Sequence, residues 1–244
     1  MPTAHHTTMS IDTSSQTVTT DDGGRMEAHL ALPERGHGPG LLLLQEIFGV
    51  NDYIRGRAQT LAELGYVVLA PDLYWRIEPG IALPHDEQGL QRAFGYLQRL
   101  DEPRAVADAG AALATLRQLP ETGGRAGVIG FCMGGRLGYH VTAGFQPDAA
   151  VLYYGSGIAN ALDLAPRIRC PVLFHFGAAD PYLPLEEVDR IRAAFSGRDD
   201  VEIHVQPEAG HAFDNYLAPM FHQPRAAAAA WELTLGFLRR RLPT

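Results

Sequence analysis

The chain has 244 residues, 46% of them hydrophobic and 20% charged, which is typical of globular proteins and excludes disordered and fibrous classes. Its 28 acidic residues outnumber 20 basic residues, all of them Arg, and the formal net charge of −8 excludes a general nucleic-acid or anionic-membrane binder. The absence of Lys excludes P-loop, Schiff-base and Ser–Lys chemistry, because each needs an amine at a fixed position.

Residues 1–15 are rich in Thr, Ser and His and predict a flexible leader without a signal peptide. No run approaches the roughly 18 apolar residues of a membrane-spanning helix, so we expect a cytoplasmic protein without a membrane partner. The two cysteines, Cys132 and Cys170, are too few for a disulfide framework or a cysteine-based zinc site, although one bridge between them stays open. We expect no metal and no cofactor.

The predicted elements alternate between strands and helices. In chain order they are a strand over 26–32, a buried strand over 40–45, a helix over 52–64 with Asp52 as N-cap and Gly65 as its end, a buried strand over 66–70, a loop over 71–84, helices over 85–100 and 104–119, a strand over 126–131, a helix over 136–142, strands over 149–154 and 171–176, a helix over 185–195, a strand over 201–205 and a helix over 223–241. This pattern predicts an α/β fold with a mostly parallel sheet covered by helices on both faces, in a single domain over 16–244.

Ligands of such sheets bind beyond the carboxyl ends of the strands. The most informative of the loops there is Gly-Phe-Cys-Met-Gly-Gly over 130–135, between a strand and a helix. Gly-x-nucleophile-x-Gly is the nucleophile elbow of α/β-hydrolases, with Cys132 in place of the usual Ser. Gly130 and Gly134 suit the close packing of this turn, and the N–H of Met133 is a candidate oxyanion donor. The alternative is a buried structural cysteine.

An acid and then a histidine should follow the nucleophile, each in a later loop after a strand. Asp180 follows the strand over 171–176, and His211 follows the strand over 201–205. His211 would exchange a proton with Cys132, and Asp180 would orient the imidazole and stabilise its charged form.

Glu46 ends an apolar strand, where a carboxylate is costly unless it is paired or used in catalysis. We interpret Glu46 as a further proton acceptor for the thiol, with a salt bridge to an arginine as the alternative. The N–H of Ile47, in the loop after this early strand, is the second candidate oxyanion donor.

These residues carry a resemblance to a known family. Gln-Glu-Ile-Phe-Gly-Val-Asn over 45–51, Pro-Asp-Leu-Tyr over 71–74, the Cys132 elbow, Asp180 and His-Ala-Phe over 211–213 are similar to the dienelactone hydrolase (carboxymethylenebutenolidase) family over about residues 25–240. The resemblance implies an α/β-hydrolase fold, a Cys132–His211–Asp180 triad, and Glu46 as the carboxylate that deprotonates the thiol. It also implies hydrolysis of a lactone that carries a carboxylate, as in the catabolism of aromatic compounds.

We also assign substrate contacts to Arg76, Phe48 and Asn215. Arg76 matches a family arginine that binds the substrate carboxylate; the alternative is that it pairs with Glu78 or Glu46 and shapes its loop. Asn215 stands four residues after His211, where the family has a second carboxylate-binding arginine, so half of that anion clamp is absent.

The sequence therefore predicts a Cys-dependent hydrolase of small carboxylic esters or lactones that forms a thioester intermediate. A broader esterase or thioesterase, and a catalytically silent binding protein with the same fold, are the two alternatives. The expected partner is a small ester or lactone, with an anionic lactone or enol ester as the first hypothesis, and with no nucleic acid. The expected assembly is a monomer or a small homo-oligomer.

Overall fold

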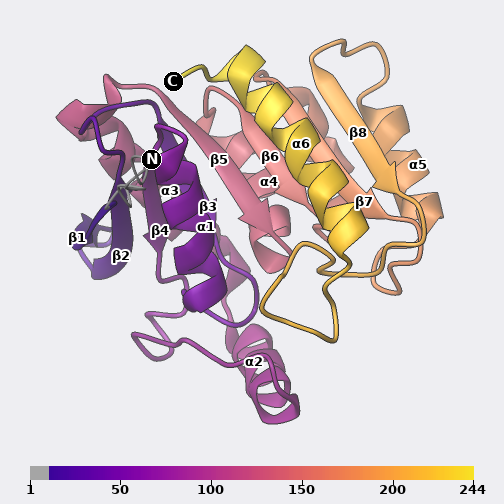
Figure 1. The fold of residues 1–244 in the computed structure, drawn as a ribbon, viewed down its shortest axis with the longest axis horizontal. Helices are drawn as coiled ribbons and strands as arrows, with labels where there is room; N and C mark the ends of the chain where they lie inside the picture. Colours follow the sequence, from indigo (N-terminus) through magenta and orange to yellow (C-terminus); the bar gives the residue numbers. More distant parts are fainter. Residues whose placement is uncertain (1–10) are drawn as a thin grey trace, which may run out of the picture.

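The computed structural model describes residues 11–244, whose strands form one sheet in the order β1-β2-β4-β3-β5-β6-β7-β8 (Figure 1). The strands are β1 Asp12–Thr19, β2 Arg25–Leu32, β3 Gly40–Leu44, β4 Val67–Pro71, β5 Ala126–Phe131, β6 Ala150–Tyr153, β7 Val172–Gly177 and β8 Val201–Gln206. β2 is antiparallel to β1 and β4, and all pairs from β4 to β8 are parallel. The predicted mostly parallel sheet is confirmed.

Helices cover both faces of the sheet. α1 Asp52–Glu63 and α6 Pro224–Arg241 pack on the face towards the viewer in Figure 1, and α3 Glu102–Gln118, α4 Met133–Phe145 and α5 Leu185–Ala194 pack on the other. α2 Glu87–Arg99 lies below the carboxyl ends of the strands. Three short 3₁₀ turns complete the described chain: Pro120–Thr122, Ile158–Asn160 and Leu162–Arg167. No helix within residues 11–244 has the length and apolarity to cross a membrane.

The central strands form because their apolar runs are buried on both faces. Every residue of β3, β4 and β5 is buried, as expected for parallel strands between two helix layers. The start of α1 differs from the prediction by one residue. Asn51, not Asp52, is the N-cap, and its side-chain oxygen accepts a hydrogen bond from the Ile54 N–H at 3.3 Å, while Asp52 lies in the first turn.

β1 corrects the expectation of a flexible leader over residues 1–15. Residues 1–10 lie outside the described part, but residues 12–19 form a strand paired along its whole length with β2. Thr17 donates a hydrogen bond of 2.7 Å to Glu27 across the pair, and Ser15 donates to the same carboxylate. A strand is predicted from alternating apolar and polar residues. β1 is an edge strand that is largely exposed, so it needs no such alternation, and its sequence does not reveal it.

Candidate active site

Cys132 occupies the tight turn between β5 and α4, with φ 57° and ψ −118°. Positive φ is uncommon for a residue other than glycine and stores backbone strain. The flanking glycines permit the turn. A Cβ atom on Gly130 would lie 2.1 Å from the Gly134 carbonyl oxygen, and one on Gly134 would lie 2.2 Å from the Leu44 carbonyl oxygen. Neither position accepts a side chain, for the reason that the sequence suggested.

The structure brings Cys132, His211 and Asp180 together. The Cys132 Sγ lies 3.1 Å from His211 Nε2, and His211 Nδ1 lies 2.8 Å from Asp180 Oδ2. Because a carboxylate only accepts hydrogen bonds, Nδ1 carries a proton and Nε2 is the atom that faces the thiol. The other Asp180 oxygen accepts the Tyr182 N–H at 2.8 Å, so the carboxylate is held at both oxygens.

The surroundings of His211 favour its charged form. Its side chain is only 11% exposed, and the rings of Tyr154 and Tyr182 pack edge-on against it. Burial alone lowers the pKa of His211, but the Cys132 thiolate and the Asp180 carboxylate outweigh burial and raise this pKa well above its usual value. The geometry therefore suits a thiolate–imidazolium pair.

Glu46 lies in the loop after β3 and is buried. Its Oε2 accepts a hydrogen bond of 2.6 Å from the Asn215 side-chain amide, while Oε1 has no hydrogen-bond partner within the described residues. Burial raises the pKa of Glu46 to about 7, and Asn215 and His211 oppose that rise. A pKa of about 7 lets Glu46 exchange a proton near neutral pH. Within residues 11–244 no arginine hydrogen-bonds to its carboxylate, in contrast to the alternative considered from sequence.

Asn215 binds Glu46 and does not line the pocket, which corrects its predicted contact with substrate. Its amide nitrogen also contacts His85 Nε2 at 3.0 Å, and its oxygen accepts the Leu217 N–H at 3.1 Å. The Asn51 amide nitrogen contacts the same His85 nitrogen at 3.1 Å. Two amide donors require His85 Nε2 to be an acceptor, and burial lowers the pKa of His85, which keeps it neutral.

Asp214 anchors the loop that carries His211 to α1, and sequence reasoning missed this role. Asp214 is fully buried, and its Oδ2 accepts hydrogen bonds from the Tyr53 hydroxyl at 2.5 Å and from Arg57 Nε and Nη2 at 3.0 and 2.7 Å. The i, i+4 spacing of Tyr53 and Arg57 places both on one face of α1. That spacing, with the Asp directly after His-Ala-Phe, was the available signal.

The two candidate oxyanion donors lie in neighbouring loops. Met133 is the first residue of α4, where a helical N–H has no intrahelical acceptor. The Ile47 carbonyl accepts a hydrogen bond of 2.9 Å from the Tyr74 hydroxyl, which also lies 3.8 Å from Met133 Sδ. Tyr74 thus ties both loops together, whereas the donor roles of Ile47 and Met133 stay predictions.

Arg76 lies away from the nucleophile, and this corrects its predicted role. Its guanidinium donates to Asp108 from Nε and Nη2 at 2.7 and 2.8 Å, and to Asp22 from Nη1 and Nη2 at 2.9 and 3.0 Å. Asp108 comes from α3 and Asp22 from the turn between β1 and β2, so Arg76 joins these elements. Neither alternative partner, Glu78 or Glu46, is involved.

A pocket opens over the Cys132 thiol and the His211 ring. Its lining includes Glu46 and Phe48, whose contact with substrate stays a prediction, and one cation that sequence reasoning missed, Arg136 on α4. The remaining lining residues are Ile47, Leu90, Phe94, Leu97, Met133, Ser156, Tyr182, Ala212 and Phe221. The position of Arg136 one turn after Cys132 was the signal that could have identified it.

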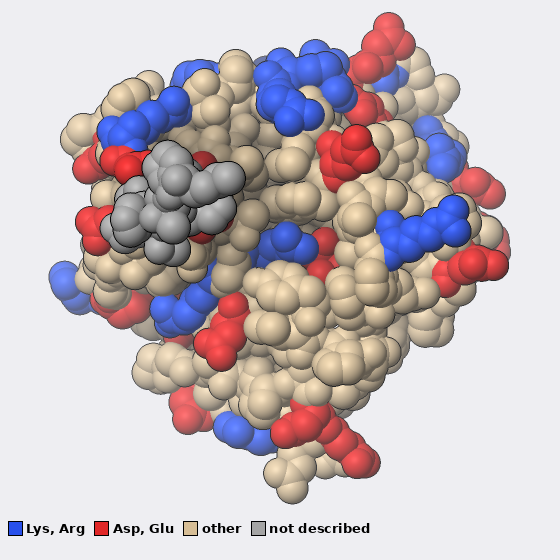
Figure 2. All heavy atoms as spheres, in the orientation of Figure 1, with Lys and Arg blue, Asp and Glu red and all other residues tan. Residues whose placement is uncertain are grey.

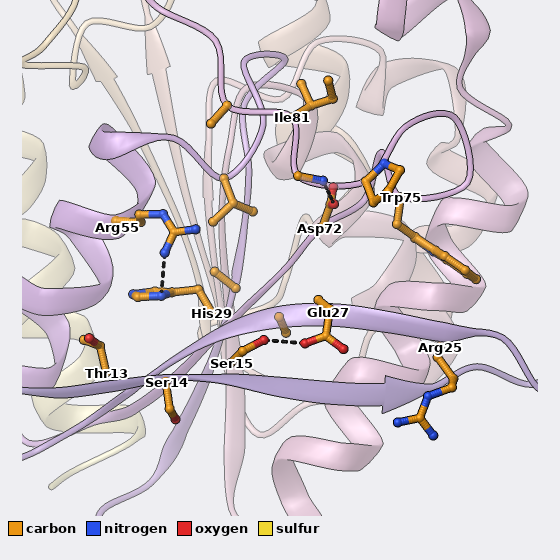
Figure 3. A pocket seen from close by; sticks show the side chains of 16 residues that line it. Thr13, Ser14, Ser15, Arg25, Glu27, His29, Arg55, Asp72, Trp75 and Ile81 are labelled. Atoms are coloured by element: carbon orange, nitrogen blue, oxygen red, sulfur yellow. Dashed lines mark hydrogen bonds between the residues drawn. The ribbon is translucent and has the colours of Figure 1, made fainter.

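A larger groove lies elsewhere, between the β1–β2 hairpin and the loop that contains Trp75 and Ile81 (Figure 3). Arg55 donates to His29 at 2.9 Å within it, and Ser15 donates to Glu27. None of the candidate catalytic residues lines this groove, so we place the chemistry at Cys132. Among residues 11–244, no group of three or more His, Cys, Asp or Glu side chains is arranged to hold a metal ion.

Comparison with known proteins identifies the family. The model of the dienelactone hydrolase family matches residues 26–242. A carboxymethylenebutenolidase of a Pseudomonas species is 38% identical over 232 residues, which cover 95% of this chain and 97% of that protein. The carboxymethylenebutenolidase of Pseudomonas putida is 36% identical over 218 residues, covering 89% of this chain and 92% of that protein.

Solved structures share the fold. A dienelactone hydrolase-like promiscuous phosphotriesterase from metagenomic libraries is 26% identical with a TM-score of 0.78, over 94% of this chain and 99% of that chain. The dienelactone hydrolase of Anabaena variabilis is 18% identical with a TM-score of 0.72, over 95% and 99% of the two chains. The fold is that of the α/β-hydrolases, and the chain belongs to the dienelactone hydrolase family, whose members are carboxylic ester hydrolases.

Proposed function

We propose that this protein hydrolyses small carboxylic esters or lactones through a covalent thioester on Cys132. The observation that carries the proposal is the continuous contact from Cys132 Sγ to His211 Nε2, 3.1 Å, and from His211 Nδ1 to Asp180 Oδ2, 2.8 Å. A nucleophile, a base and an orienting acid at these distances can carry out acyl transfer.

In the first half of the reaction, the Cys132 thiolate attacks the ester carbonyl carbon and forms the C–S bond. The carbonyl oxygen becomes an oxyanion, which the N–H groups of Ile47 and Met133 can stabilise. When this intermediate collapses, the C–O bond breaks, and the His211 imidazolium gives its proton to the leaving alkoxide.

In the second half, His211 takes a proton from a water molecule, whose oxygen attacks the thioester carbon. The C–S bond then breaks, the thiolate leaves, and the carboxylic acid is released. Glu46 can accept the thiol proton before the first attack, because its raised pKa of about 7 suits a base near neutral pH. Both Glu46 and His211 are candidates for that deprotonation.

Rapid mixing with p-nitrophenyl acetate tests the proposal. We expect a burst of p-nitrophenol and, after acid quenching, one acetyl group on Cys132 by peptide mass spectrometry. Cys132→Ala should lose at least ~10³-fold in kcat and the acetyl adduct. An active Cys132→Ala enzyme, or acetylation elsewhere with Cys132 unmodified, would contradict the proposed nucleophile and move the chemistry to another site. A wild-type protein that neither hydrolyses the ester nor becomes acetylated would favour the silent binding protein.

The second cysteine is the matched control. Cys170 lies two residues before β7, and burial raises the pKa of its thiol to about 12. Cys170→Ala should therefore keep wild-type activity, and iodoacetamide should alkylate Cys132 well before Cys170. Loss of activity only in Cys170→Ala would reverse the assignment.

A further inference from the structure

The pocket over Cys132 has an apolar wall supplied by one helix. Leu90, Phe94 and Leu97 of α2 all line it, and their i, i+4, i+7 spacing places them on a single face of that helix. Phe94 is 37% exposed, which is unusual for a phenylalanine on a helix that could have buried it. Leu90 and Leu97 also pack partly against the core, so Phe94 is the residue of this stripe that is most open to a ligand.

The rest of the lining combines apolar side chains with a few polar ones, among them Glu46, Arg136 and Ser156. Phe48, Met133 and Phe221 complete the apolar wall from three other segments of the chain. In the space-filling view, charged groups of both signs are scattered over the upper part of the molecule, whereas the surface between the loop before α6 and α2 is largely uncharged (Figure 2). Within that loop, Tyr216, Leu217 and Met220 are exposed.

Charges that could attract an anionic substrate are already compensated. Arg136, which lines the pocket, donates from Nε to Glu102 at 2.7 Å and from Nη1 to the Ser156 carbonyl oxygen at 3.2 Å. Arg76 is held by two aspartates outside the pocket. Asn215, which replaces the family's second arginine, directs its amide to Glu46 and His85.

A substrate carboxylate in this pocket would thus lose its hydration without gaining an uncompensated cation, and it would approach the Glu46 carboxylate. Desolvating a charge without a partner is costly, whereas an apolar group gains free energy against the α2 wall. The same lining that disfavours an anionic group therefore favours an apolar group of similar size.

We infer that the site selects neutral esters with an apolar moiety over esters that carry a carboxylate, and that the α2 stripe is the specificity-determining wall. This inference rests on the proposed function, because it concerns the substrate of the same Cys132 site.

Two matched ester pairs test the selection. p-Nitrophenyl hexanoate and p-nitrophenyl hydrogen adipate share the leaving group and a six-carbon acyl chain, and differ by a terminal carboxylate. Phenyl acetate and 4-acetoxybenzoate place the same difference on the leaving group. For the wild-type protein, we expect kcat/KM to be at least roughly tenfold higher for the neutral member of both pairs. A carboxylated ester hydrolysed as fast as its neutral partner, or faster, overturns the inference.

Variants locate the selection on the named residues. Phe94→Ala should lower the ratio of kcat/KM for p-nitrophenyl hexanoate to that for p-nitrophenyl hydrogen adipate several-fold. Gln91→Ala, at an exposed position of α2 outside the pocket, should leave this ratio unchanged. Glu102→Gln should lower this ratio as well, because it removes the carboxylate that neutralises Arg136 and leaves the guanidinium to attract the adipate carboxylate. An equal effect of Phe94→Ala on both esters would contradict the role of the wall.

The two proposals fail in different ways. If the carboxylated esters are hydrolysed faster than the neutral ones and hydrolysis still depends on Cys132, only the inferred selection of neutral esters fails. If none of the four esters is hydrolysed, or hydrolysis survives Cys132→Ala, the proposed function itself fails.

Discussion

The side-chain amide of Asn215 donates a hydrogen bond to the Glu46 carboxylate at 2.6 Å, and both residues are buried. An arginine at position 215, as in the related family pattern, would bring a positive charge to Glu46, whereas asparagine brings only a dipole. Burial therefore dominates and raises the pKa of Glu46 to about 7. This single pair links the stability, the pH dependence and the specificity of the site.

The first prediction concerns stability. The pKa of Glu46 is about 7 in the folded protein, against about 4.3 for an unperturbed Glu. Between about pH 4 and pH 7, Glu46 is therefore protonated in the folded state and ionised in the unfolded state. The contribution of Glu46 to stability is thus largest below about pH 4 and falls as the pH rises to about 7. From pH 5 to pH 8, the free energy of unfolding of Glu46→Gln should gain roughly 2–3 kcal/mol relative to wild type.

Urea unfolding at both pH values measures this difference. Glu34→Gln is the control, because Glu34 is exposed and should show no such change. A pH-independent difference between Glu46→Gln and wild type would show that Glu46 ionises normally in the folded protein.

The second prediction separates Glu46 from His211 as the base for the thiol. Asn215→Leu removes the hydrogen bond that stabilises the ionised Glu46, so the pKa of Glu46 should rise by about one unit. If Glu46 is the base, the acidic limb of kcat/KM for p-nitrophenyl acetate moves to higher pH by the same amount. Leu217→Ala, an exposed change in the same loop, should leave the limb in place. An unmoved limb in Asn215→Leu assigns the deprotonation to His211.

Much of the site could be predicted because it depends on local sequence. The elbow needs glycine on both sides of Cys132, and Asp180 and His211 each follow a strand that the sequence pattern predicts. Parallel strands bring such loops to one edge of the sheet whatever their order. The hydrophobic runs that become β3, β4 and β5 were equally visible, since full burial needs continuous apolar residues.

Arg76 shows what could not be predicted. Its position after β4 was correct, but its partners Asp22 and Asp108 lie 54 and 32 residues away in the chain, and only the packed fold brings them to it. The helix α2 was predicted, over residues 85–100. The direction of its apolar face, however, depends on how the helix packs beyond the edge of the sheet. Contacts between distant segments, and not secondary structure, decide these roles.

The third prediction ranks the partners of Cys132. His211→Ala should fold and reduce hydrolysis of p-nitrophenyl acetate to near the background rate, because the His211 ring contacts the thiol at 3.1 Å, protonates the leaving group and activates the attacking water. Asp180→Asn should lose less activity, since Asp180 orients the imidazole and stabilises its charge but transfers no proton. Single-turnover rates measure both variants. An Asp180→Asn enzyme at the wild-type rate would exclude Asp180 as the orienting acid.

The fourth prediction replaces the substrate role of Arg76 with a structural one. The Arg76 side chain is 29% exposed, but that of Asp108 is only 2% exposed, so Arg76→Ala leaves a buried carboxylate with the Trp75 indole N–H as its remaining donor. We expect a loss of about 2 kcal/mol in the free energy of unfolding, less than for a fully buried pair. The ratio of kcat/KM between p-nitrophenyl hexanoate and p-nitrophenyl hydrogen adipate should not change.

Arg104→Ala is the matched control for this change. Arg104 pairs with Asp21 and Asp22, whose side chains are 61% and 42% exposed, and water screens such exposed pairs so that they contribute little to stability. Its variant should therefore unfold close to the wild-type midpoint. If Arg76→Ala unfolds there as well and loses activity only towards the adipate ester, Arg76 reaches the substrate carboxylate in solution. The neutral-ester preference of the pocket would then need another explanation, because a free cation would stand at its edge.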